Sequence, residues 1–183
     1  MKNSEFITGA VPITKEEVRA LALSKLQLKG KKRMIDVGAG TGTVGIEAAI
    51  SHEELEVIAI ECKEAAFNLT QQNIEKFGLK NIQLVKGYAP IELEQKVDAI
   101  FMGGTGGKLE EMIKWSYESL VAGGRVVANF IILDTFYEAM KLMEEVGFKD
   151  IEVTQISISK LDKLGKGKYL KPENPIFIIE GTK

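Results

Sequence analysis

The stretch MIDVGAGTG, residues 34–42, places an acid and three glycines at the end of a continuous apolar run. The acid is Asp36, and Gly38, Gly40 and Gly42 follow it at every second position. Glycine has no side chain, so a ligand can approach the backbone closely at such a turn. An acid and glycines with this spacing after a buried strand indicate a site for a nucleotide-like cofactor.

A second acid, Glu61, follows the next apolar run, LEVIAI, residues 55–60. A carboxylate at the end of a second strand can accept hydrogen bonds from both hydroxyls of a ribose. The alternative interpretation is structural: the acids only end strands and the glycines only turn the chain. The joint spacing of the two acids and the turn favours cofactor binding.

The motif GTGTVG, residues 40–45, also satisfies the G-x-G-x-x-G pattern of nicotinamide-binding domains. A chain of 183 residues leaves no second domain to hold a dehydrogenase substrate. S-adenosylmethionine (SAM) therefore suits the site better, with Asp36 receiving its ammonium group directly or through water.

Composition limits the class of protein further. The chain has 45% hydrophobic residues, and its length predicts a single domain over residues 1–183. The formal net charge of −2 argues against a nucleic-acid partner, and no apolar stretch reaches the ~18 residues of a membrane span. One cysteine, Cys62, cannot form an internal disulfide, and one histidine, His52, argues against a metal site. We expect a cytoplasmic protein without metal.

Strands and helices alternate along the chain, starting with a helix in which Thr14 and Glu17 are predicted to form a capping box. Two final strands have no helix between them, and the polar, basic segment 160–174 that joins them is predicted to be a mobile surface loop. The predicted fold class is α/β: a doubly wound, Rossmann-like sheet of five parallel strands plus a C-terminal antiparallel pair, with helices on both faces. The strands are predicted at 33–37, 55–60, 82–87, 97–102, 125–133, 151–159 and 174–181, and the helices at 13–28, 43–51, 63–77, 108–122 and 136–146.

Four stretches together resemble one family. They are GAVPITKEEVRALALSKL, DVGAGTGTVGIEAA, GYAPIEL and FMGGTGG, and the resemblance covers nearly the whole chain. The family is the decarboxylating precorrin methyltransferase of anaerobic cobalamin (vitamin B12) biosynthesis, a class I SAM-dependent methyltransferase. The resemblance implies methyl transfer to carbon 15 of cobalt-precorrin-6B with loss of carbon dioxide from the ring C acetate. It also implies a tetrapyrrole substrate and a homotetramer.

The resemblance assigns cofactor contacts position by position. Relatives often carry an acid where this chain has Tyr88, so a backbone contact from its neighbour, or stacking by Tyr88, is expected on the adenine side. The cofactor-binding residues predicted from the two acids and the resemblance together are Thr14, Asp36, Gly38, Ala39, Gly40, Thr41, Gly42, Glu61 and Ala89.

A second glycine-rich stretch follows the fourth predicted strand. It comprises Gly103, Gly104, Thr105, Gly106 and Gly107, more glycine than a turn requires. One interpretation is a flexible connection; the other is that bare backbone lets a wide, flat tetrapyrrole approach the methyl donor. These five residues are the candidates for the substrate loop, and no residue is assigned as a general acid or base.

Other acceptors are less consistent with the sequence. The Asn/Asp-Pro-Pro-aromatic loop of many amino-methylating enzymes is absent, and Asn129 and Asp134 alone are weak candidates for a catechol-type metal site. Lys15, Arg19, Lys108 and the basic late loop are candidates to bind substrate carboxylates. A SAM-dependent methyltransferase of another small molecule or of a protein, and a non-catalytic SAM-binding subunit, stay open as alternatives.

Overall fold

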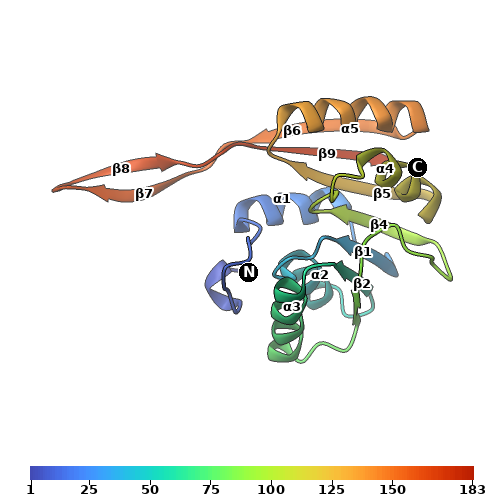
Figure 1. Cartoon of the computed structure of the whole chain (residues 1–183), viewed down its shortest axis with the longest axis horizontal. Coiled ribbons are helices and arrows are strands. Elements are labelled where there is room, and N and C mark those ends of the chain that lie inside the picture. The colour runs from blue at the N-terminus through green and yellow to red at the C-terminus, as the bar shows by residue number, and fades with distance from the viewer.

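Seven strands form one mixed sheet in the computed structural model, which describes residues 1–183 (Figure 1). The strand order is β3-β2-β1-β4-β5-β9-β6. The first five strands are parallel, and β9 runs antiparallel between β5 and β6, which confirms the predicted fold class. The strands are β1 (Arg33–Val37), β2 (Glu56–Glu61), β3 (Ile82–Lys86), β4 (Val97–Met102), β5 (Leu120–Phe130), β6 (Lys149–Ile156) and β9 (Ile176–Thr182).

Helices cover both faces of this sheet, which explains why its central strands are continuously apolar. Along β1, Met34 packs into the core shared with α1 and α2, whereas Ile35 packs into the core shared with α4 and α5. None of the helices combines the length and the apolar character needed to cross a membrane. They are α1 (Glu16–Leu26), α2 (Thr43–Ser51), α3 (Glu64–Phe77), α4 (Leu109–Ser119) and α5 (Leu133–Val146), after a short 3₁₀ turn η1 (Asn3–Glu5).

The start of α1 differs from the prediction. Lys15 is the N-cap residue, with no side-chain capping bond, so the predicted capping box of Thr14 and Glu17 is wrong. Glu17 instead forms an ion pair with Lys160 at 3.3 Å. Contacts between distant segments therefore override a local capping signal at this position.

The boundary between α4 and β5 also differs. The helix ends at Ser119, and Leu120 already pairs with Val97 of β4. The glycines of AGG, residues 122–124, do not end the helix but lie where the register of β5 against β4 shifts. Such an irregularity is a known use of glycine in strands, and it resembles a helix C-terminus in sequence. Further on, Leu133 begins α5 instead of ending β5.

The predicted mobile loop at 160–174 is wrong. Its residues form a two-stranded hairpin of β7 (Ser159–Leu164) and β8 (Gly167–Pro172), which projects from the body of the molecule (Figure 1). Leu161 pairs with Leu170, and Gly165 adopts a left-handed φ of +60° in the turn. The frequent lysines conceal this pairing in the sequence. We call residues 159–172 the arm.

Candidate functional site

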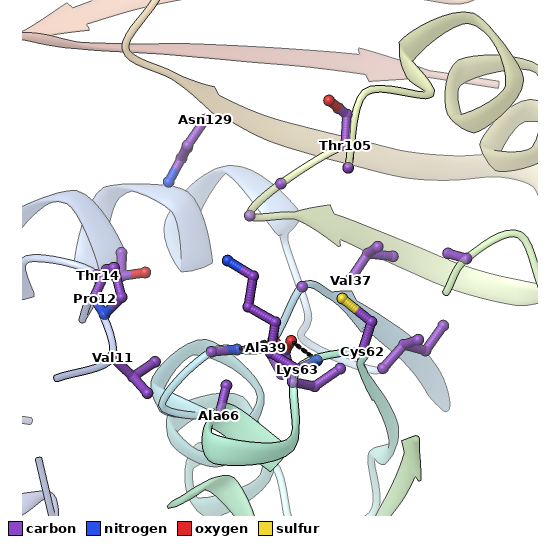
Figure 2. A pocket seen from close by; sticks show the side chains of 18 of the residues that line it. Val11, Pro12, Thr14, Val37, Ala39, Cys62, Lys63, Ala66, Thr105 and Asn129 are labelled. Carbon is purple, nitrogen blue, oxygen red and sulfur yellow. Dashed lines mark hydrogen bonds between the residues drawn. The ribbon is translucent and has the colours of Figure 1, made fainter. Parts of the chain in front are cut away.

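A cavity of about 450 Å³ opens at the carboxyl ends of β1, β2, β4 and β5 (Figure 2). Open α/β sheets place their ligands at this edge. One side of the cavity, the glycine-turn half, consists of the opening segment 11–15, the turn after β1 and the residues that follow β2. The other side, the β4–β5 half, consists of residues contributed by the β4–α4 loop, β5 and β9.

Glu61 ends β2 and is only 5% exposed. Its Oε2 accepts a hydrogen bond from the Gly40 amide at 2.8 Å, and its Oε1 accepts one from the Lys63 amide at 2.8 Å. A carboxylate oxygen has two acceptor positions, so each oxygen keeps one for a ligand donor. The carboxylate is thus held in place by the backbone and remains able to receive two hydroxyl groups.

The turn after β1 requires its glycines. Gly38, Gly40 and Gly42 all have left-handed φ values, of +70°, +60° and +78°. A Cβ at Gly42 would lie 2.7 Å from the side chain of Thr70, and a Cβ at Gly38 would lie 3.3 Å from the Gly104 nitrogen. The backbone conformation therefore disfavours larger residues at all three positions, and crowding adds to this at Gly38 and Gly42.

Asp36 lies beneath this turn and outside the pocket wall. Its Oδ2 accepts a hydrogen bond from the Gly45 amide at 2.8 Å, and its buried Oδ1 has no partner. Burial raises the pKa of this carboxyl to about 7; the Gly45 hydrogen bond opposes the shift and the charge of Glu61 adds to it. The predicted contact between Asp36 and the ammonium group of SAM stays a prediction. Because Asp36 is buried outside the pocket wall, a contact through water is favoured over a direct one.

The opening segment is tied to the same turn. The Thr41 hydroxyl donates to the Pro12 carbonyl at 3.0 Å, and the Thr70 hydroxyl donates to the Gly40 carbonyl at 2.8 Å. Thr14 lines the pocket, and Figure 2 shows it beside Pro12 at the pocket's edge. The Thr41 bond holds the opening segment beside the turn as one wall of the pocket, and the Thr70 bond holds α3 to the same turn.

The β4–α4 loop has more free space around its glycines than the turn after β1 has. A Cβ at Gly104, Gly106 or Gly107 would have nothing within 4 Å, whereas one at Gly103 would meet the Gly38 carbonyl at 3.2 Å. Gly103 therefore serves the packing between the two loops. The three glycines after it border free space.

The structure brings most of the predicted site residues together. The predicted residues outside the pocket wall are Asp36, Thr41, Gly42 and Gly107, of which Thr41 and Gly42 support the turn from within. The predicted residues that line it are Thr14, Gly38, Ala39, Gly40, Glu61, Ala89, Gly103, Gly104, Thr105 and Gly106.

The comparisons with known proteins agree with this geometry. The model of the family described as "Precorrin methyltransferase domain" matches residues 6–183. The chain belongs to the precorrin methyltransferase family. It is 45% identical, over 98% of its own length and 94% of the relative's, to a protein of Salmonella typhimurium named cobalt-precorrin-6B C(15)-methyltransferase (decarboxylating). It is 44% identical, over 94% of its length and 89% of the relative's, to a probable enzyme of the same name from Saccharolobus solfataricus.

Solved structures of this precorrin methyltransferase family share the fold. A precorrin-6y C5,15-methyltransferase from Geobacter metallireducens has a TM-score of 0.92 and 35% identity, and covers 100% of this chain and 97% of its own. A protein titled precorrin 8W decarboxylase from Methanobacterium thermoautotrophicum has a TM-score of 0.88 and 32% identity, with 99% and 98% covered.

Among the pocket residues of this precorrin methyltransferase that the sequence did not predict as binding residues, the ones with reactive or polar side chains are Cys62, Lys63 and Asn129 (Figure 2). Cys62 and Lys63 directly follow Glu61, so their position after a ligand-binding strand end could have indicated them. The sequence indicates Asn129 only as a weak candidate for a metal ligand. The structure contains no group of three or more His, Cys, Asp or Glu side chains that could hold a metal ion.

The cations expected to bind substrate are mostly engaged elsewhere. Arg19 is fully buried and outside the pocket wall, where its guanidinium donates to Glu47 at 2.6 Å and to the Met1 carbonyl at 2.6 Å. It therefore orders the N-terminal segment. Lys15 lines the pocket but pairs with Glu173 at 2.7 Å, and Lys108 pairs with Glu111 at 3.3 Å.

Proposed function

We propose that this chain transfers a methyl group from SAM to carbon 15 of cobalt-precorrin-6B and releases the ring C acetate carboxyl as carbon dioxide. The observation that carries the proposal is one pocket with two unlike halves: a rigid turn with a fixed carboxylate, facing an open glycine loop. The names of the relatives at 45% and 44% identity support the same reaction.

The glycine-turn half fits SAM. Glu61 keeps one acceptor position on each oxygen for the two ribose hydroxyls, and the backbone of Gly38 and Gly40 is free of side chains. Ala89, a pocket residue only 9% exposed, supplies backbone for the adenine side, and Tyr88 at 67% exposure can cover it. We assign Thr14, Ala39, Thr41 and Gly42 to the same cofactor site, the last two as supports of the turn.

The β4–β5 half fits a broad, flat acceptor. Gly104 and Gly106 leave free space beside the pocket, and the Thr105 hydroxyl and the loop amides can donate to substrate carboxylates. We assign Gly103, Gly104, Thr105, Gly106 and Gly107 to the acceptor loop. A tetrapyrrole with acidic side chains is the substrate class that this surface supports.

Catalysis in this proposal rests on positioning. Bound SAM supplies an activated methyl group, and the macrocycle carbon is an electron-rich nucleophile, so little acid-base chemistry is asked of the protein. Holding donor and acceptor in line can lower the barrier by ~7–11 kcal/mol, which rigid loops on a sheet edge are suited to supply.

Mass spectrometry of the product tests the proposal. With SAM and cobalt-precorrin-6B, the product should gain about 14 mass units from the methyl group and lose about 44 as carbon dioxide. SAM turnover only with another small molecule or a protein would favour the first alternative. SAM binding without turnover of any acceptor would favour a non-catalytic subunit.

We further propose that the enzyme is a cytoplasmic homotetramer. An isolated two-stranded hairpin is marginally stable in water, yet the arm exposes Leu161, Leu164 and Leu170 by 66%, 73% and 66%. Other copies of the chain would cover these side chains. Light scattering should give about four times the chain mass of 20.2 kDa. The double variant Leu161→Glu, Leu164→Glu should give a smaller assembly.

A further inference from the structure

Asn73 is a fully buried polar residue of α3 that lies outside the pocket wall. Its Oδ1 accepts a hydrogen bond from the Ile7 amide at 2.7 Å. Its Nδ2 donates to the carbonyls of Ile7 and Thr41, each at 3.0 Å. One side chain therefore joins the residues just before the opening segment 11–15 to the turn after β1.

The Thr41 carbonyl needs this partner because the hydrogen bonding at the start of α2 is irregular. In a regular helix the Gly45 amide would donate to the Thr41 carbonyl. Here the Gly45 amide donates to Oδ2 of Asp36 at 2.8 Å. Thr41 is only 2% exposed, so its carbonyl needs a donor within the protein, and Asn73 supplies it. Asn73 thus completes the hydrogen bonding of the turn to which we assign SAM.

The opening segment is held by two further hydrogen bonds. The Thr41 hydroxyl donates to the Pro12 carbonyl at 3.0 Å, and Arg19 donates to the Thr14 carbonyl at 2.9 Å. Figure 2 shows Pro12 and Thr14 with Val11 along one side of the pocket. This wall therefore keeps its place through bonds to residues distant in the sequence.

The exposed residues 8–10 connect this wall to Ile7. Before them, Phe6 is only 4% exposed and meets Phe77 of α3 edge to face, with ring centroids 5.3 Å apart. Without the Asn73 bonds, Phe6 would still attach the N-terminal residues to α3. The loss would then fall mainly on the link between the wall and the turn.

We propose that Asn73 is a positioning residue of the cofactor site, which holds the opening segment and the turn after β1 at the spacing that SAM requires. This inference rests on the proposed placement of SAM in the glycine-turn half. A wall that is already in place needs no ordering when the ligand binds, so affinity is higher. If the wall is in place in only a fraction of the molecules, the apparent Kd rises by the reciprocal of that fraction.

Calorimetric titration of Asn73→Leu with SAM tests the inference. Leucine is similar in size to asparagine and removes all three hydrogen bonds. We expect the Kd for SAM to rise ~10-fold or more. In turnover, KM for SAM should rise likewise, whereas kcat at saturating SAM and KM for the macrocycle should stay within about threefold of wild type. Bound SAM contacts both segments and restores their spacing, which explains the difference.

Asn81→Leu is the matched control. Asn81 also makes three side-chain hydrogen bonds to backbone, to the carbonyls of Ala49, Glu53 and Leu55 at 3.1, 3.4 and 3.0 Å. It lies outside the pocket wall and bonds to neither the opening segment nor the turn after β1. Both variants should lower the melting temperature. Only Asn73→Leu should weaken SAM binding, an effect that a merely structural role would not produce.

Hydrogen exchange gives a second measurement that needs no turnover. Without SAM, the backbone amides of residues 7–15 should exchange faster in Asn73→Leu than in wild type. At saturating SAM they should regain wild-type protection. Equal exchange in the two proteins without SAM would show that the wall does not depend on Asn73, and the inference would be wrong.

Two affinity results would also overturn the inference. If Asn73→Leu folds and binds SAM within ~2-fold of wild type, Asn73 serves the fold alone. If Asn81→Leu weakens SAM binding as much as Asn73→Leu does, the effect follows from lost stability. Glu61→Gln separates these failures from a failure of the proposed site: unchanged SAM affinity in Glu61→Gln as well would make the placement of SAM wrong.

Asn73→Asp replaces Asn73→Leu if the leucine variant does not fold. Aspartate keeps the size of the side chain and the acceptor for the Ile7 amide, but it loses both donors. The same rise in the Kd for SAM is expected. If neither variant folds, Asn73 is a structural residue and the inference is overturned.

Discussion

Two glycine-rich loops meet at the pocket, and glycine has a different role in each. In the turn after β1, neighbouring atoms crowd Gly38 and Gly42, and all three glycines have left-handed φ values. In the β4–α4 loop, Gly104 has ordinary φ and open space around the position of a Cβ. The first loop therefore needs glycine to fold. In the second, Gly103 packs against Gly38, and Gly106 and Gly107 have left-handed φ values, so Gly104 is the position that is free to lack a side chain for a ligand's sake.

The largest expected effect is that of Gly42→Val. The added side chain would meet Thr70 at 2.7 Å and Ile46 at 3.1 Å, on a backbone with φ +78°. Backbone strain and overpacking together should lower the free energy of unfolding by about 2–5 kcal/mol. Urea denaturation measures this. A loss below ~0.5 kcal/mol would mean that the turn adapts and that the comparison of the loops is wrong.

Gly104→Val should separate binding from turnover. Open space around its Cβ predicts wild-type folding stability and SAM affinity within about threefold, while methylation of the macrocycle falls by ~100-fold or more. Calorimetric titration and product formation measure the two effects. Gly106→Val is predicted to act likewise, but its φ of +58° adds strain, so Gly104 is the cleaner position. If both variants turn over the macrocycle at the wild-type rate, the β4–α4 loop only connects β4 to α4 and does not bind the acceptor.

Asp36 gives the crowded turn a pH dependence. Its folded pKa of about 7 lies above the ordinary pKa of an aspartate, 3.8, so between these two pH values the folded state holds a proton that the unfolded chain has lost. The contribution of Asp36 to the free energy of unfolding is therefore largest below about pH 4 and declines until about pH 7. Between pH 5.5 and 7 we expect a loss of about 2 kcal/mol, which Asp36→Asn should remove. Urea denaturation midpoints at the two pH values measure this loss in the wild type and in Asp36→Asn. An equal loss of stability in the two proteins would show that other groups titrate.

Glu61→Gln tests the cofactor side with the smallest expected effect. Glutamine keeps an acceptor for one backbone amide but loses the charge, so SAM should bind more weakly by about 1–2 kcal/mol in a folded protein. Calorimetric titration measures the affinity. Glu64→Gln is the control, because Glu64 is exposed and pairs with Lys86 outside the pocket. Unchanged affinity in Glu61→Gln would place the ribose elsewhere.

The sequence by itself determined the class of fold and the centre of the site. Continuous apolar runs that alternate with helices ended by Gly78 or Gly147 are local signals, and they predicted the parallel sheet. Glu61 and the turn from Gly38 to Gly42 could be found because strand ends in such a sheet meet at one edge. Matching motifs along nearly the whole chain indicated the family.

Only the tertiary structure decided the features that depend on residues distant in the chain. The arm forms because Leu161 pairs with Leu170 across a turn, a pairing that a lysine-rich composition conceals. The crowding around Gly42 comes from Thr70, and the packing of the fold leaves the buried Asn129 Oδ1 without a hydrogen-bond partner. Spacing along the chain specifies what a residue can bond, but packing decides which of its groups remain free for a ligand.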